Sequence, residues 1–207
     1  VLDVSNPENP KQIGEISTRT LFAGSEINSV AVKNGIVALA VQAANKTDNG
    51  WVVLYKANDI TKPVTAPLAI GALPDNVVFS PDGKTVLVAN EGEPNEDYSI
   101  DPEGTVSIID IRDIRDISKP VVKSADFRAF NGKEAELRAK GVRIYGPKDN
   151  TKAYAANNLT TAAKDFEPEY ITVSADNKTA WVTLQENNAL AKIDLATAKV
   201  LDVLPLG

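Results

Sequence analysis

The sequence predicts an all-β fold built from repeated four-stranded units. Three observations lead to this prediction. A strand–turn–strand pattern recurs along the chain, most clearly at residues 77–90 and 171–184 and more weakly at 30–41. Each copy is followed by a third strand-like segment and by a fourth. Helical periodicity is found at only one place, so a fold that alternates strands and helices is disfavoured.

The residues at the tips of the repeated hairpins favour tight turns. Glycine and asparagine tolerate the positive φ angles that short hairpin connections require. The dipeptides at the three tips are Asn34-Gly35, Asp82-Gly83 and Asp176-Asn177.

The third strands set the period of the repeat. Taking Leu2, Leu54, Ile109 and Ile193 as equivalent positions gives spacings of 52, 55 and 84 residues. The first two spacings suit β-propeller blades of about 40–50 residues with modest loops. The third spacing is too long, and residues 132–141 within it are typical of a short helix closed by glycine.

These spacings predict a partial β-propeller of about three four-stranded blades, with a short helical insertion around residues 128–166. A β-sandwich stays possible, although the four-strand period favours the propeller. We expect one continuous unit that needs the remainder of the same propeller, or a partner chain, to close the ring. The expected division is 1–20 for the end of a preceding blade, 21–70 for a blade, 71–126 for a blade, 127–166 for the insertion and 167–207 for a blade.

Composition excludes several kinds of function. The 207 residues carry a net charge of −6, which disfavours nucleic acid and anionic membrane surfaces as partners. The chain has no cysteine and no histidine, so a disulfide, a thiolate metal site and imidazole catalysis are all excluded. No apolar run approaches the length of a transmembrane helix.

Acidic and amide side chains gather in the loops expected on one face of the propeller. These loops lead into the first strand of each blade and out of the second. Calcium takes six to eight oxygen ligands from such groups, so we expect a possible Ca²⁺ site here. The candidate metal ligands are Asp75, Asn90, Glu91, Glu93, Glu167, Glu169 and Glu186. Alternatively, loop Asn and Asp side chains only hydrogen-bond the local backbone.

A substrate on this face would need further polar contacts. Asn76, Arg143 and Asn187 are the candidate substrate-binding residues. Lys46, Arg143 and Lys148 lie in or near loops where a cationic side chain could bind a phosphate, although ordinary surface solvation is the favoured explanation. The sequence identifies no nucleophile, so the catalytic residues stay unknown.

Several segments resemble the choice-of-anchor I family, whose propeller repeats are of the YVTN type. The segments that carry this resemblance are residues 81–85, 89–94, 104–110, 141–147, 167–171 and 183–189. The resemblance covers roughly residues 28–207 and implies a secreted or surface-anchored bacterial propeller. Some members of the family are labelled alkaline phosphatase.

Two functions are compatible with these observations. The first is a metal-dependent phosphoester hydrolase in which calcium on the acidic face polarises the phosphate and activates water. The second is a non-catalytic extracellular or periplasmic propeller that binds a glycan or a protein, or forms part of a surface layer, with structural calcium. The fold itself does not choose between them.

Overall fold

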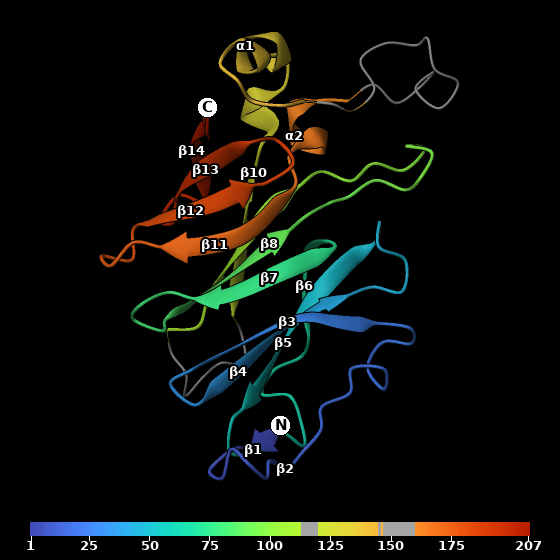
Figure 1. The fold of residues 1–207 in the computed structure, drawn as a ribbon, viewed down its shortest axis with the longest axis vertical. Helices are drawn as coiled ribbons and strands as arrows, with labels where there is room; N and C mark the ends of the chain where they lie inside the picture. Colours follow the sequence, from blue (N-terminus) through green and yellow to red (C-terminus); the bar gives the residue numbers. More distant parts are fainter. Residues whose placement is uncertain (113–119, 145, 147–159) are drawn as a thin grey trace.

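A computed structural model describes residues 1–112, 120–144, 146 and 160–207, and it contains three four-stranded antiparallel sheets (Figure 1). The first sheet consists of β3 (Glu26–Lys33), β4 (Ile36–Gln42), β5 (Asn49–Lys56) and β6 (Leu68–Ala72). The second consists of β7 (Pro74–Phe79), β8 (Thr85–Asn90), β9 (Thr105–Asp110) and β10 (Val121–Asp126). The third consists of β11 (Pro168–Val173), β12 (Thr179–Leu184), β13 (Ala189–Asp194) and β14 (Lys199–Pro205). Near the N-terminus, β1 (Leu2–Asp3) pairs with β2 (Lys11–Gln12).

Chain order and spatial order agree in every sheet, so each one is a four-stranded meander. The prediction of an all-β fold with repeated four-stranded units is therefore confirmed. The expected turn residues take the expected conformations: φ is 49° at Asn34, 77° at Gly35, 71° at Gly83 and 60° at Asn177. An Asn or Gly at these positions permits the positive φ with little strain.

Neighbouring sheets contact each other through their first strands, with β7 against β3 and β11 against β7. A side-chain hydrogen bond fixes each junction. The Val77 N–H donates to Ser29 Oγ at 3.2 Å, and the Ile171 N–H donates to Asn76 Oδ1 at 3.2 Å. The edge amides of one sheet are thus satisfied by side chains of the preceding one.

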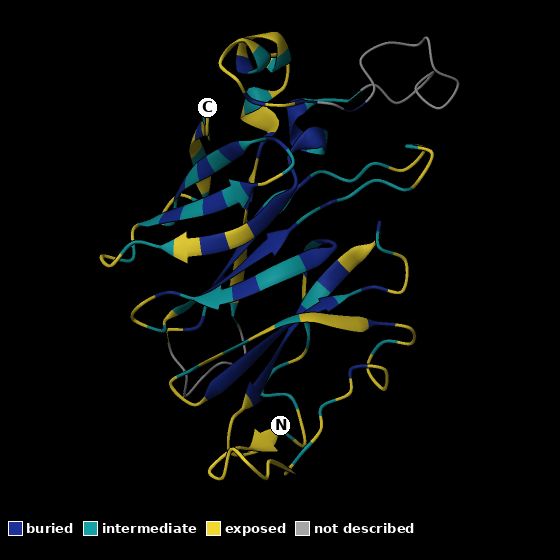
Figure 2. Cartoon of the chain, viewed as in Figure 1, coloured by how far each residue is buried: buried dark blue, intermediate teal, exposed yellow. Residues whose placement is uncertain are grey.

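Alternating residues of the middle strands pack toward opposite neighbours. In β8, Val86 and Val88 join the core shared with the first sheet, while Leu87 and Ala89 join the core shared with the third. Because side chains alternate along a strand, a strand with a neighbouring sheet on each side is apolar throughout. Figure 2 shows the result, with the middle strands buried and the turns exposed.

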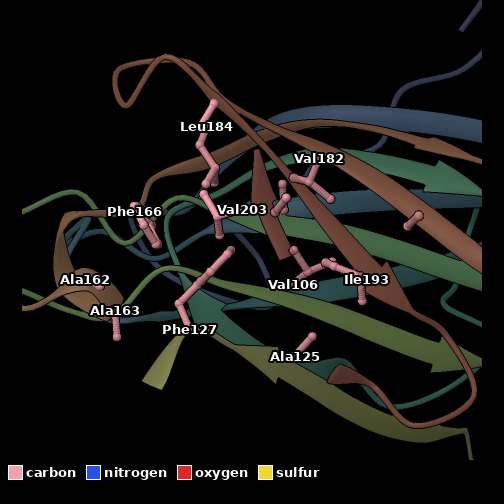
Figure 3. Close-up of a cluster of buried hydrophobic side chains, with 14 of the residues drawn as sticks. Val106, Ala125, Phe127, Ala162, Ala163, Phe166, Val182, Leu184, Ile193 and Val203 are labelled. Carbon is pink, nitrogen blue, oxygen red and sulfur yellow. The ribbon is translucent and has the colours of Figure 1, made fainter. Parts of the chain in front are cut away.

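The insertion extends the core between the second and third sheets (Figure 3). It contains η2 (Arg128–Phe130), α1 (Glu134–Ala139) and α2 (Ala162–Asp165), so the helix expected within residues 132–141 is present. Residues 145 and 147–159 of the insertion lie outside the described residues. Phe127 and Phe166 are fully buried and meet edge to face with ring centroids 5.3 Å apart. This contact fastens the two ends of the insertion to the sheets.

None of the helices described is long and apolar enough to cross a membrane.

Candidate acidic site

Three carboxylates of the second sheet lie where β7 begins and β8 ends. Pro74 pairs with Asn90 across the two strands, and the Glu91 N–H donates to Leu73 O at 2.9 Å. This pairing brings Asp75, on β7, beside the loop that carries Glu91 and Glu93. The second sheet thus presents its carboxylates at one end.

The third sheet places three more carboxylates at the equivalent end. Glu167 and Glu169 flank the first residue of β11 and are 6% and 8% exposed. Glu186 follows β12, whose last residue, Leu184, pairs with Pro168. Because β11 packs against β7, the carboxylates of the third sheet lie near those of the second sheet.

The two sets of carboxylates act on one another. Burial, and then the charges of Glu167, Asp75, Glu93 and Glu186, raise the pKa of Glu91 to about 7. Four of the predicted carboxylates therefore influence the pKa of Glu91, and the charge of Glu91 in turn influences the pKa of Glu169. We call Asp75, Glu91, Glu93, Glu167, Glu169 and Glu186 the acidic cluster.

Glu169 is the second member of the acidic cluster with a strongly raised pKa. Its pKa is raised to about 8, first by burial, then by a hydrogen bond with Glu186 and by the charges of Glu186, Glu91 and Asp75. Burial also raises the pKa of Asp75. A hydrogen bond between two carboxyl groups needs a proton between them, so the cluster holds protons where isolated acids would be ionised.

Lys46, in the connection between β4 and β5, brings a cation from the first sheet to this face. Its Nζ lies 2.6 Å from Glu93 Oε2, and both side chains are partly exposed. Exposed ion pairs of this kind contribute little to stability. The pair does place an ammonium group at the edge of the acidic cluster.

The acidic cluster offers oxygen atoms that lack partners. Glu186 Oε2 is buried and has no hydrogen-bond partner among the described residues. Within the same part of the chain, no group of three or more acidic side chains is arranged to hold a metal ion as it stands. Carboxylate oxygens are the ligands that hard cations take, and a nearby positive charge lowers raised carboxyl pKa values.

Asn90 lies in the junction between sheets. It is fully buried, and its Nδ2 donates to Thr105 Oγ1 at 3.0 Å and to Ser107 Oγ at 2.9 Å on β9. Its side chain also abuts Gly71 of the first sheet. In this structure Asn90 therefore orients two hydroxyl groups.

Asn187 fastens the insertion to the third sheet. Its Nδ2 donates to Arg143 O at 3.0 Å, to Asp165 O at 2.8 Å and to Asp165 Oδ2 at 3.0 Å. Its Oδ1 accepts from the Glu167 N–H at 3.3 Å. With both ends of the amide engaged, Asn187 holds Glu167 in place and has a structural role here.

The other two candidate substrate-binding residues differ in position. Asn76 bonds the backbone of Ile171 at the junction of two sheets. The backbone N–H of Arg143 donates to Asn187 O at 2.8 Å. The Arg143 side chain is exposed. These contacts do not place the Arg143 guanidinium at the acidic cluster.

Two buried acids were not among the predicted residues. Asp165 is 4% exposed and accepts from the Gly146 N–H at 2.7 Å. Asp101 has two buried oxygens without hydrogen-bond partners among the described residues, and burial raises its pKa to about 6. In the sequence Asp101 and Asp165 look like ordinary acidic residues of a loop and a helix, so no local signal separates them from exposed acids.

Repeated four-stranded meanders that pack through their first strands define the class of this protein as a β-propeller. The chain belongs to the choice-of-anchor I domain family, whose match covers residues 1–207, and is thus a β-propeller surface protein. A search of curated proteins finds no match.

Similar solved structures share the fold at low sequence identity. A functionally unknown protein from Desulfotomaculum acetoxidans is 12% identical with a TM-score of 0.52, and the match covers 99% of this chain and 48% of that protein's chain. A luciferin-regenerating enzyme is 13% identical with a TM-score of 0.51, covering 92% and 49%. The β-propeller domain of the Trilobed protease from Pyrococcus furiosus is 11% identical with a TM-score of 0.41, covering 87% and 42%. The chain spans less than half the length of each.

Proposed function

We propose that this chain forms part of an extracellular or periplasmic surface propeller whose acidic cluster binds calcium. The observation that carries the proposal is the convergence of six carboxylates from two neighbouring sheets, with the pKa of Glu91 raised to about 7 and that of Glu169 to about 8. Calcium would offset the burial and the repulsion that together raise these pKa values. Glu91, Glu169 and Glu186 are the residues that we expect to hold it.

A calcium ion shared by Glu91, which follows β8, Glu169 on β11 and Glu186, which follows β12, would tie two sheets together. Anything that binds the folded state alone stabilises it, so Ca²⁺ is expected to raise the melting temperature. The metal-binding step also releases protons below about pH 8, because Glu91 and Glu169, with pKa values of about 7 and 8, must ionise to bind. The rise in melting temperature and the release of protons can both be measured on the 207-residue chain.

Isothermal titration calorimetry with CaCl₂ at pH 7.5 tests the proposal. We expect saturable binding that is lost in Glu169→Gln and Glu186→Gln and kept in Glu96→Gln, a control on the exposed part of the same face. Equal binding by the wild type and both cluster variants would rule out the acidic cluster as the site.

Phosphoester hydrolysis is a second candidate function, and Lys46 favours it. Its ammonium group at the edge of the acidic cluster could bind a phosphate oxygen beside a calcium ion. Turnover of p-nitrophenyl phosphate at pH 8–9 that requires Ca²⁺ and falls in Lys46→Met would support it. Calcium binding without turnover would leave the non-catalytic surface propeller.

A further inference from the structure

A groove of about 480 Å³ lies outside the acidic cluster, between the outer strand of the first sheet and the outer half of the second. Its volume falls within the range of small-molecule sites. The polar lining comes from β9, β10 and the segments that flank them, and Gly71 of β6 faces it across the groove. The polar and backbone part of the lining includes Gly71, Glu103, Thr105, Ser107, Ser124 and Arg128.

Gly71 keeps the floor of the groove free of a side chain. A Cβ atom at this position would lie 2.6 Å from Thr105 Oγ1 and 2.7 Å from the Cβ of Asn90. Such distances are too short for any residue with a side chain unless β6 or β9 shifts. The floor is therefore formed by bare backbone on one side and by hydroxyl groups on the other.

Asn90 fixes the hydrogen-bonding role of the two floor hydroxyls. Its Nδ2 donates to both Thr105 Oγ1 and Ser107 Oγ, so each oxygen is already used as an acceptor. Each hydroxyl then has its own proton left to donate. Asn90 Oδ1 is itself buried without a partner among the described residues. Ser107 is only 1% exposed and Thr105 is half-buried, so the Thr105 hydroxyl is the oriented donor at the floor, and Asn90 acts as its positioning residue.

The rim supplies both donors and acceptors. Arg128 Nε donates to Glu103 Oε2 at 2.7 Å, which holds the two side chains side by side. The terminal guanidinium nitrogens and the second carboxylate oxygen remain for a ligand. The Ser124 hydroxyl, also in the lining, can donate and accept.

Two of the three charged side chains in the lining balance each other. Arg128 is paired with Glu103, and the Lys123 ammonium, which keeps its charge, donates to Ala196 O in the turn between β13 and β14 at 3.0 Å. Ala69, Pro102 and the exposed Val122 add apolar surface to the lining, which forms an apolar strip. Interleaved donors, acceptors and an apolar strip match a molecule with many hydroxyl groups and C–H faces.

We propose that this groove between β6 and β9–β10 binds a neutral saccharide unit. Thr105 and Arg128 donate to sugar hydroxyl oxygens, Glu103 accepts from a sugar hydroxyl, and the apolar strip packs against the ring. The groove is separate from the acidic cluster, so binding does not require calcium.

An array of neutral, sulfated and carboxylated oligosaccharides, probed with the intact chain in EGTA, tests the proposal. The affinity of the strongest neutral hit is then measured by isothermal titration calorimetry. We expect Thr105→Val and Arg128→Gln each to weaken binding about tenfold or more. Thr172→Val and Arg19→Gln change the same residue types at exposed positions elsewhere and are expected to bind like the wild type.

Arg128 is exposed, so its replacement leaves the fold intact even if Thr105→Val lowers stability. Circular dichroism of each variant verifies this. The proposal is overturned if no neutral saccharide binds, if only sulfated or carboxylated ones bind, or if both groove variants bind as tightly as the wild type.

Discussion

Replacing Glu91 by Gln removes a charge from the acidic cluster while nearly keeping its shape. In the folded protein the pKa of Glu91 is raised from 4.5 to about 7, chiefly by burial. The folded state then binds a proton that the unfolded chain has released between these pH values. The free energy of unfolding contributed by this group is complete below about pH 4.5 and is lost as the pH rises through about 7.

The size of the effect follows from the pKa change. Raising a pKa by about 2.5 corresponds to about 3.4 kcal/mol when the group is fully shielded from solvent. Glu91 is only partly buried, so solvent screening reduces this to about 1–2 kcal/mol. A chain of this size gains about 2–4 °C in melting temperature per kcal/mol. Metal-free Glu91→Gln should therefore melt about 2–8 °C above the wild type at pH 8.

Differential scanning calorimetry in EGTA at pH 4.5 and pH 8 measures this difference. At pH 4.5 the wild-type carboxyl group is protonated in the folded state, so the variant is expected to gain nothing. Glu96→Gln, at an exposed position of the same loop, should change neither melting temperature. A Glu91→Gln protein that melts lower than the wild type at pH 8, or shifts equally at both pH values, would refute the reasoning.

Three further substitutions test the packing around the site, each by urea unfolding. Asn187→Ala should cost about 3 kcal/mol, because it removes the hydrogen bonds of this buried amide to Arg143 O, Asp165 O and Asp165 Oδ2. Phe166→Ala should cost about 3–5 kcal/mol, because it opens a cavity in the core against Phe127. Asn76→Ala should cost about 1–2 kcal/mol by removing the acceptor of the Ile171 N–H.

Asn6→Ala, on the exposed N-terminal turn, is the matched control and should cost less than about 0.5 kcal/mol. A cost below that value for Asn187→Ala would show that its hydrogen bonds do not hold the insertion. The same result for Phe166→Ala or Asn76→Ala would contradict the packing described for that residue.

The fold could be predicted from local features of the sequence. Asn34-Gly35 and Asp82-Gly83 mark turns through backbone preferences that act within a few residues, and the spacing of the third strands then fixes the repeat. The insertion was predicted from an excess length. Its attachment through Phe127 and Phe166 was not, because that contact joins residues far apart in the chain.

The acidic site could be predicted only in part. The sequence indicated which loops share a face, and Glu91 and Glu169 do influence each other there. It did not distinguish Asn90 and Asn187 from ligands, since an amide at a strand end or in a turn has the same appearance in the sequence whether it meets solvent or buried polar groups. Their partners, such as Ser107 and Asp165, become neighbours only after the sheets pack.

Calcium binding by the acidic cluster is tested most directly by a crystal structure grown with CaCl₂, with anomalous scattering used to locate the ion. We predict an anomalous peak bound by oxygen atoms of Glu91, Glu169 and Glu186, absent from crystals of Glu169→Gln. A map at saturating calcium with no peak at the acidic cluster, or with its peaks only elsewhere on the surface, would contradict the account.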